Sequence, residues 1–131
     1  MTTPFWCLIV VALLPYILAG TGGYLRIQQL GALDNNHPRV QATKLEGVAA
    51  RAYAAQMNAW EALPLFATAV FLAHLTHADP AASATAAVGY LATRIGHPIL
   101  YLANLATVRT IVFTIGLGFI VRLLFLALAA G

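Results

Sequence analysis

The sequence has very few charged residues and almost no cysteine. Of its 131 residues, 8% are charged and 61% are hydrophobic, whereas a soluble domain has about a quarter charged residues. This composition excludes an ordinary soluble domain and predicts an integral membrane protein. The single cysteine, Cys7, excludes an intrachain disulfide and a CxxC redox or metal motif.

The basic residues do not form a pattern typical of nucleic-acid binding. Seven Lys and Arg against four Asp and Glu give a net charge of +3, but the basic residues are dispersed among apolar runs. The GxSxG, Walker A, HExxH and GxGxxG motifs are all absent. His74 and His77 lie near a turn beside Asp79, where exposed side chains are more common than a metal site. We therefore predict no nucleic-acid partner and no metal.

The apolar runs predict an all-α bundle of four transmembrane helices. A hydrocarbon core about 30 Å thick requires about 20 mostly apolar residues per helix. Four such runs occur, at residues 4–24, 48–75, 81–103 and 108–130. Because the connections are short, an up-and-down arrangement in a single membrane domain, residues 1–131, is expected.

The positions of the basic residues predict an orientation in the membrane. Arg26, Arg39 and Lys44 lie in the first connection and Arg109 lies beside the third, whereas the second has no Lys or Arg. The positive-inside rule then places the first and third connections in the cytoplasm and both termini outside. Met1 is not followed by a basic n-region, so we interpret the first run as a transmembrane helix and not as a cleaved signal. The short loops suggest a bacterial inner membrane.

Polar residues form a stripe on each of the two middle helices. In the second run, Arg51, Asn58 and Glu61 share one side of a helix. In the third run, residues spaced by three and four share one side: Arg94, His97 and Tyr101. Charges at membrane depth cost several kcal/mol unless they are paired or hydrated. The stripes therefore indicate either structural pairing between helices or a ligand site.

The depth of each residue predicts which groups can meet. At about 1.5 Å per residue, Arg94 reaches the level of Asn58, and Arg122 in the fourth run reaches the level of Glu61. An ion pair between Glu61 and Arg122 is therefore expected.

The stripes also carry a resemblance to a known family. The segment RAYAAQMNAWEALPLF, residues 51–66, resembles the helix-two signature of the MAPEG family, the membrane-associated proteins in eicosanoid and glutathione metabolism. The pattern Arg94-x-x-His97-x-x-x-Tyr101, followed by Arg109, is similar to the helix-three and helix-four pattern of that family. The resemblance covers essentially the whole chain.

The resemblance implies a homotrimer with three glutathione sites at the subunit interfaces, open toward the cytoplasm. Glutathione would be the co-substrate, and the reaction would be a transferase or peroxidase reaction on a lipophilic electrophile dissolved in the bilayer. The implied catalytic residues are Arg109 and Tyr101. A thiol has a pKa of about 8.5, and a neighbouring guanidinium lowers it and so favours the nucleophilic thiolate. The implied glutathione-binding residues are Arg51, Gln56, Asn58, Glu61, Arg94 and His97.

The chain also departs from the family pattern. Catalytic members usually have an arginine at the position of Ala54 and often a tyrosine at the position of Ala62. Arg109 is about one residue out of register with the family's catalytic arginine. These departures leave a second hypothesis, a non-catalytic MAPEG-like scaffold that binds a lipid or another anionic metabolite. A small transporter is a third, which the absence of paired broken helices and of an inverted repeat disfavours.

Overall fold

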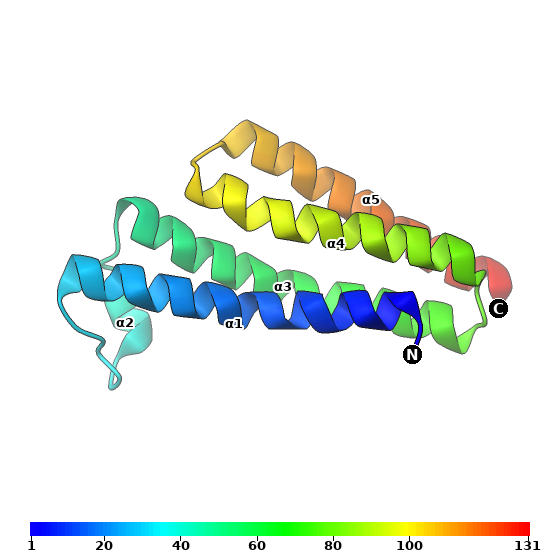
Figure 1. Cartoon of the computed structure of the whole chain (residues 1–131), viewed down its shortest axis with the longest axis horizontal. Helices are drawn as coiled ribbons and strands as arrows, with labels where there is room; N and C mark the ends of the chain where they lie inside the picture. Colours follow the sequence, from blue (N-terminus) through cyan, green and yellow to red (C-terminus); the bar gives the residue numbers. More distant parts are fainter.

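The computed structural model describes all residues, 1–131, and every regular element in it is a helix. Four long helices lie side by side, and a short one follows the first (Figure 1). The N- and C-termini lie at the same end of the bundle (Figure 1). The helices are α1 (Thr3–Leu30), α2 (Pro38–Ala42), α3 (Gly47–Leu75), α4 (Pro80–Leu102) and α5 (Ala106–Ala130).

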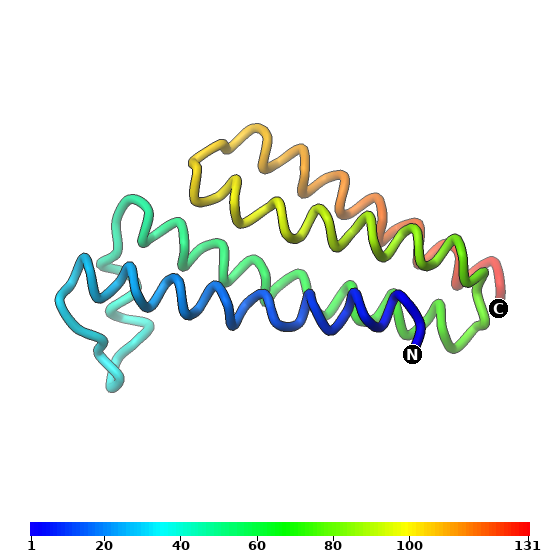
Figure 2. The backbone as a smooth tube through the Cα atoms, in the orientation of Figure 1, coloured from blue at the N-terminus to red at the C-terminus, as the bar shows by residue number.

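The bundle consists of two pairs of helices. α1 packs mainly against α3, and α4 packs mainly against α5. Figure 2 shows the α4–α5 pair diverging from the α1–α3 pair toward the end at which α4 joins α5. The start of α3 and the start of α5 lie at this end. It is the end that the positive-inside rule predicts to face the cytoplasm.

The first helix is longer than the sequence predicts. The predicted range ends at residue 24, but α1 continues through Gly20-Thr21-Gly22-Gly23 to Leu30. Gly22 is buried there, and a Cβ at this position would lie 3.9 Å from Gln56 Oε1. The helix ends at Leu30 and is capped by Gly31, whose φ of 85° is left-handed and whose N–H donates to the Ile27 carbonyl. Packing against α3 therefore outweighs the low helix propensity of glycine.

A short helix, α2, lies within the segment expected to be a polar connection. Pro38 occupies its first turn, where a missing N–H is tolerated. An Arg26 guanidinium nitrogen donates to the Pro38 carbonyl at 3.3 Å, and Gln41 Nε2 donates to the Ala32 carbonyl at 2.7 Å. These contacts hold α2 beside the end of α1.

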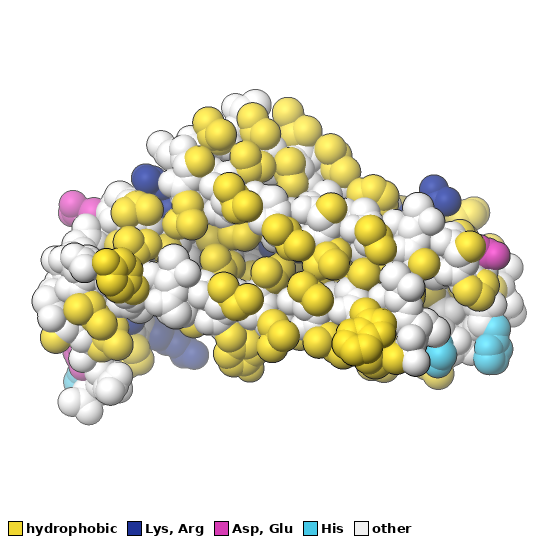
Figure 3. Space-filling model, viewed as in Figure 1, with side chains coloured by type: hydrophobic (Ala, Val, Ile, Leu, Met, Phe, Trp, Pro, Cys, Tyr) yellow, Lys and Arg dark blue, Asp and Glu magenta, His cyan; other side chains and the backbone are white.

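Two of the helices, α1 and α5, are long and apolar enough to cross a membrane. Figure 3 shows hydrophobic side chains over the middle of the visible face and most charged and histidine side chains toward its two ends. This distribution is the one expected for a protein whose middle contacts lipid and whose ends contact water and headgroups.

Small residues allow the helices to approach closely. Ala52, Ala69 and Ala86 are fully buried. Between α4 and α5 the approach is closer still, since a Cβ at Gly89 would overlap the ring of Phe119. Association of helices in a membrane depends on such packing, because lipid tails are as apolar as leucine.

Candidate functional site

The centre of the candidate site is a hydrogen bond between α3 and α4. Arg94 is 4% exposed, and its guanidinium donates to Asn58 Oδ1 at 2.7 Å. The two predicted stripes therefore meet at this level. The acceptor is a neutral amide, so the positive charge of Arg94 is hydrogen-bonded but not neutralised by Asn58.

Arg94 and Asn58 line a pocket of about 210 Å³ between α3, α4 and α5. Glu61 lines the same pocket and is exposed. The other walls are mostly apolar: Ala62, Leu65, Tyr90, Phe113, Leu117 and Ile120. Because several of these apolar walls are also exposed on the outside of the bundle, the pocket opens where lipid would lie.

The expected ion pair between Glu61 and Arg122 is not formed. The only ion pair in the structure joins His37 to Asp34, at 3.8 Å. Arg122 is exposed on α5 and does not line the pocket of Glu61; Arg94 is the basic residue that does. The prediction was wrong because equal depth in a membrane does not place two residues on facing sides of their helices.

Tyr90 also lines this pocket, and it is not among the residues that the sequence predicts for the site. Its ring stacks on Phe66 with centroids 4.2 Å apart, and its hydroxyl donates to the Ala62 carbonyl at 3.5 Å. Tyr90 precedes Arg94 by four residues and therefore lies on the same side of α4. Extending the α4 stripe by one turn would have found it.

The second part of the site is a cluster of Arg109, Tyr101 and His97. The Arg109 guanidinium carbon lies 3.9 Å from the centroid of the Tyr101 ring, which is cation–π geometry. The His97 ring meets the Tyr101 ring edge to face, with centroids 5.6 Å apart. Both predicted catalytic residues are therefore in contact, at the junction of α4 and α5.

His97 has an unused polar atom. The residue is 3% exposed, and its Nδ1 has no hydrogen-bond partner. Buried polar atoms are nearly always paired, so an orphaned one calls for a ligand or a water molecule. Because His97 lies beside Tyr101, a polar ligand of this nitrogen would bind near the junction of α4 and α5.

Arg51 and Gln56 do not join the pocket around Asn58. Arg51 Nε donates to the Leu102 carbonyl at 3.2 Å, so this side chain satisfies a carbonyl at the end of α4. Gln56 lies on another face of α3, in a second pocket of about 560 Å³ between α1, α2 and α3. In one subunit, the predicted binding residues are therefore divided between two faces.

The second pocket is also polar. Arg26 and Arg39 line it together with Gln56. The Arg26 guanidinium carbon lies 5.8 Å from the centroid of the Tyr53 ring, and Arg26 Nε is buried without a partner. The sequence indicates only the membrane orientation from Arg26. It does not indicate a binding role, because the first helix carries no stripe of polar residues.

Comparison with known proteins decides the family. The family model described as MAPEG family matches residues 3–129. The chain belongs to the MAPEG family. The resemblance of residues 51–66 and of the α4 pattern is therefore confirmed at the level of the family. No curated protein and no solved structure matches the chain.

MAPEG membership agrees with the composition and with the two membrane-length helices, so the chain is an all-helical membrane protein. It is also consistent with a glutathione-related function at a membrane. In this MAPEG chain, Ala62 lines the α3–α4–α5 pocket, where a tyrosine would fill part of the space. Ala54 is half-buried on the same helix.

Proposed function

We propose that the chain is a glutathione-dependent membrane transferase or peroxidase that acts on lipophilic electrophiles. The observation that carries this proposal is the contact between Arg109 and Tyr101, with buried His97 beside them. A guanidinium at this position favours a thiolate, and a tyrosine hydroxyl can donate a hydrogen bond to the sulfur. In a transferase reaction, the sulfur forms a bond to the electrophilic carbon, and the leaving group departs with the bonding electrons.

The pocket around Arg94 supports binding of the rest of glutathione. Its carboxylates suit the guanidinium of Arg94, and its amino group suits the carboxylate of Glu61. The exposed apolar walls of the same pocket, including Phe113 and Leu117, give a lipophilic second substrate a path from the bilayer.

The size of this pocket supports a homotrimer. About 210 Å³ is smaller than the roughly 300–1,000 Å³ of ordinary ligand pockets, so one subunit does not enclose a tripeptide. A cyclic trimer joins two different faces of each subunit. The face that carries Gln56 and Arg26 would then complete the face that carries Asn58 and Arg94, and glutathione would lie between them.

The proposal includes four membrane spans. α3 has 29 residues and α4 has 23. Even the shorter one is about 35 Å long at about 1.5 Å per residue, enough to cross a core of about 30 Å.

We place both termini outside, in the inner membrane of a bacterium. A cysteine introduced at Asn35 in a Cys7→Ala background should then resist a membrane-impermeant maleimide in intact cells, while one introduced at Ala130 should react.

Glutathione binding is the first test of the function. Calorimetry on the purified protein in nanodiscs should detect binding of glutathione and of S-methylglutathione, which has no free thiol. Only glutathione should be consumed when an aryl halide is added, with release of one halide per conjugate.

Native mass spectrometry tests the proposed assembly. It should show trimers in mild detergent, and monomers alone would contradict the homotrimer.

The second candidate is a non-catalytic MAPEG scaffold that binds a lipid or an anionic metabolite. Ala54 and Ala62 favour it, because both are small where catalytic relatives are expected to carry a polar side chain. Under this hypothesis, the calorimetric signal for glutathione would be absent, or would be present without turnover of the aryl halide.

A further inference from the structure

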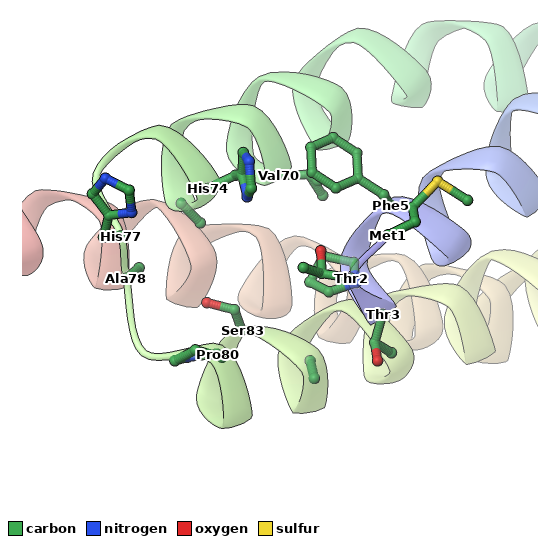
Figure 4. Close-up of a pocket in the computed structure, with 13 residues that line it drawn as sticks. Met1, Thr2, Thr3, Phe5, Val70, His74, His77, Ala78, Pro80 and Ser83 are labelled. Atoms are coloured by element: carbon green, nitrogen blue, oxygen red, sulfur yellow. The ribbon is translucent and has the colours of Figure 1, made fainter.

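A separate cavity lies at the end of the bundle opposite to Arg51 and Arg109. Its volume is about 480 Å³, within the range of roughly 300–1,000 Å³ that is usual for ligand pockets. The start of α1, the end of α3 and the start of α4 enclose it (Figure 4). Its polar side chains are two imidazoles and three hydroxyls, and no acidic or basic residue other than histidine lines it: Thr2, Thr3, His74, His77 and Ser83.

A buried hydroxyl, that of Ser83, lines this cavity. Ser83 is 5% exposed, and its Oγ has no hydrogen-bond partner. Figure 4 shows this oxygen directed between the end of α3 and the start of α4. Buried hydroxyls are nearly always paired, so this one requires a partner that the chain does not supply.

The other helical hydroxyls show that the Ser83 geometry is unusual. Beyond the first turn of a helix, each threonine donates to a carbonyl three or four residues earlier, as Thr85 does to Ala81 at 2.9 Å. The corresponding carbonyl for Ser83 is that of Asp79, which accepts the Ser83 backbone N–H at 3.0 Å but not its hydroxyl. The hydroxyl is therefore left available to a ligand in the cavity.

The electrostatics of the cavity favour an anion. α1 begins at Thr3 and α4 begins at Pro80, and both residues line the cavity. Helix N-termini carry partial positive charge and bind phosphate groups well. Asp79 does not line the cavity, but its carboxylate accepts the Ala82 N–H and caps α4; the start of α1 has no such side-chain cap.

The walls and the position of the cavity favour a lipid. Phe5, Val70 and Ala73 form apolar walls beside the hydroxyls. Trp6, which follows Phe5 on α1, is 57% exposed, and exposed tryptophans are enriched where a membrane meets water. A ligand with a polar head at the helix ends and an apolar tail along the bundle fits this arrangement.

We propose that this cavity binds the phosphodiester group of an anionic glycerophospholipid, with the Ser83 hydroxyl donating to a phosphate oxygen. A phosphodiester carries one negative charge, which suits a site with helix N-termini and hydroxyls but no Lys or Arg. The acyl chains would lie against Phe5 and Val70. The site is independent of the Arg109 cluster and does not require glutathione.

Native mass spectrometry on the intact protein tests this proposal. The protein is released from detergent containing either dioleoylphosphatidylglycerol or dioleoylglycerol, which lacks the phosphodiester. At collision energies that remove loosely bound lipid, one phosphatidylglycerol per subunit should remain and no dioleoylglycerol. Ser83→Ala should weaken the retained binding about tenfold, the usual effect of losing one hydrogen bond to a charged group.

Thr85→Ala is the matched control, since Thr85 is exposed on the same helix and bonds its own backbone. It should retain phosphatidylglycerol as the unmodified protein does. Thermal unfolding of both variants without added lipid separates loss of binding from loss of folding. Equal retention of the two lipids, or a Ser83→Ala variant that is folded and binds with unchanged affinity, would overturn the proposal.

Discussion

The guanidinium of Arg94 and the Asn58 side-chain carbonyl are 2.7 Å apart, and this hydrogen bond joins α4 to α3 beside the α3–α4–α5 pocket. A charge at membrane depth normally has a charged partner or water. Here the only partner within the subunit is a neutral oxygen. The guanidinium is thus held in place while its positive charge stays available to an anionic ligand, which makes Asn58 a positioning residue for Arg94.

Asn58→Ala should therefore destabilise the protein. The change leaves a buried guanidinium nitrogen without its acceptor, and a lost hydrogen bond to a charged group costs about 1.5–3 kcal/mol. Thermal unfolding in detergent should show a lower midpoint. Asn35→Ala, a change in the exposed loop before α2, is the control and should leave the midpoint unchanged. An Asn58→Ala midpoint equal to that of the control would mean that water replaces the amide.

Glu61→Gln should alter ligand binding but not folding. Glu61 is exposed and forms no ion pair within the subunit, so its charge can be removed without leaving a buried cation unpaired. In the proposed complex its carboxylate holds the amino group of glutathione, and calorimetry should show weaker binding, by about tenfold for one charged contact. A drop in the unfolding midpoint would instead reveal an ion pair between the subunits of the proposed trimer.

The sequence predicts the long helices well because hydrophobic runs of membrane length are a strong signal. The end of α1 was less predictable. Gly20-Thr21-Gly22-Gly23 is a breaking signal in isolation, but Gly22 is buried and faces Gln56 of α3, so the helix continues through these residues while packed against α3. Local composition does not contain such tertiary contacts.

The part of the site that lies on a single helix was predictable from residue spacing. Spacing along one helix places Arg94, His97 and Tyr101 on one side, and the structure agrees. Spacing does not say how two helices are rotated against each other, which is why the Glu61–Arg122 pair was wrong. The unpaired hydroxyl of Ser83 had no sequence signal at all, since a serine in a helix normally bonds its own backbone.

Gly89→Ala should weaken the packing of α4 on α5. An added methyl group would overlap the Phe119 ring, and overpacking of a well-packed contact typically costs about 1–3 kcal/mol. Gly96→Ala on the same helix is the control, because a Cβ there would have no neighbour within 4 Å. Thermal unfolding should show a lower midpoint for Gly89→Ala only. Equal midpoints would show that the Phe119 ring moves aside freely.

Arg109→Ala should lower activity more than it lowers affinity. Arg109 contacts the Tyr101 ring and is the cation proposed to favour the thiolate, while Arg94 lies in the other part of the site and is proposed to hold a carboxylate of glutathione. Without Arg109, the pKa of the bound thiol should rise toward about 8.5, its value in free solution. The ultraviolet absorbance of the thiolate at neutral pH and the rate of conjugation should therefore both fall, while calorimetry shows a smaller change in glutathione binding.

Two further variants make the Arg109 test specific. Arg122→Ala removes a guanidinium from the exposed surface of the same helix and should leave thiolate absorbance and turnover unchanged. Tyr101→Phe keeps an aromatic ring beneath Arg109 but removes the hydroxyl, so it should lower the absorbance less than Arg109→Ala does. Because thiolate formation releases a proton, raising the pH should restore the absorbance of the Arg109→Ala complex. If turnover falls while the thiolate absorbance at neutral pH is unchanged, Arg109 acts on the electrophile or its leaving group and not on the sulfur.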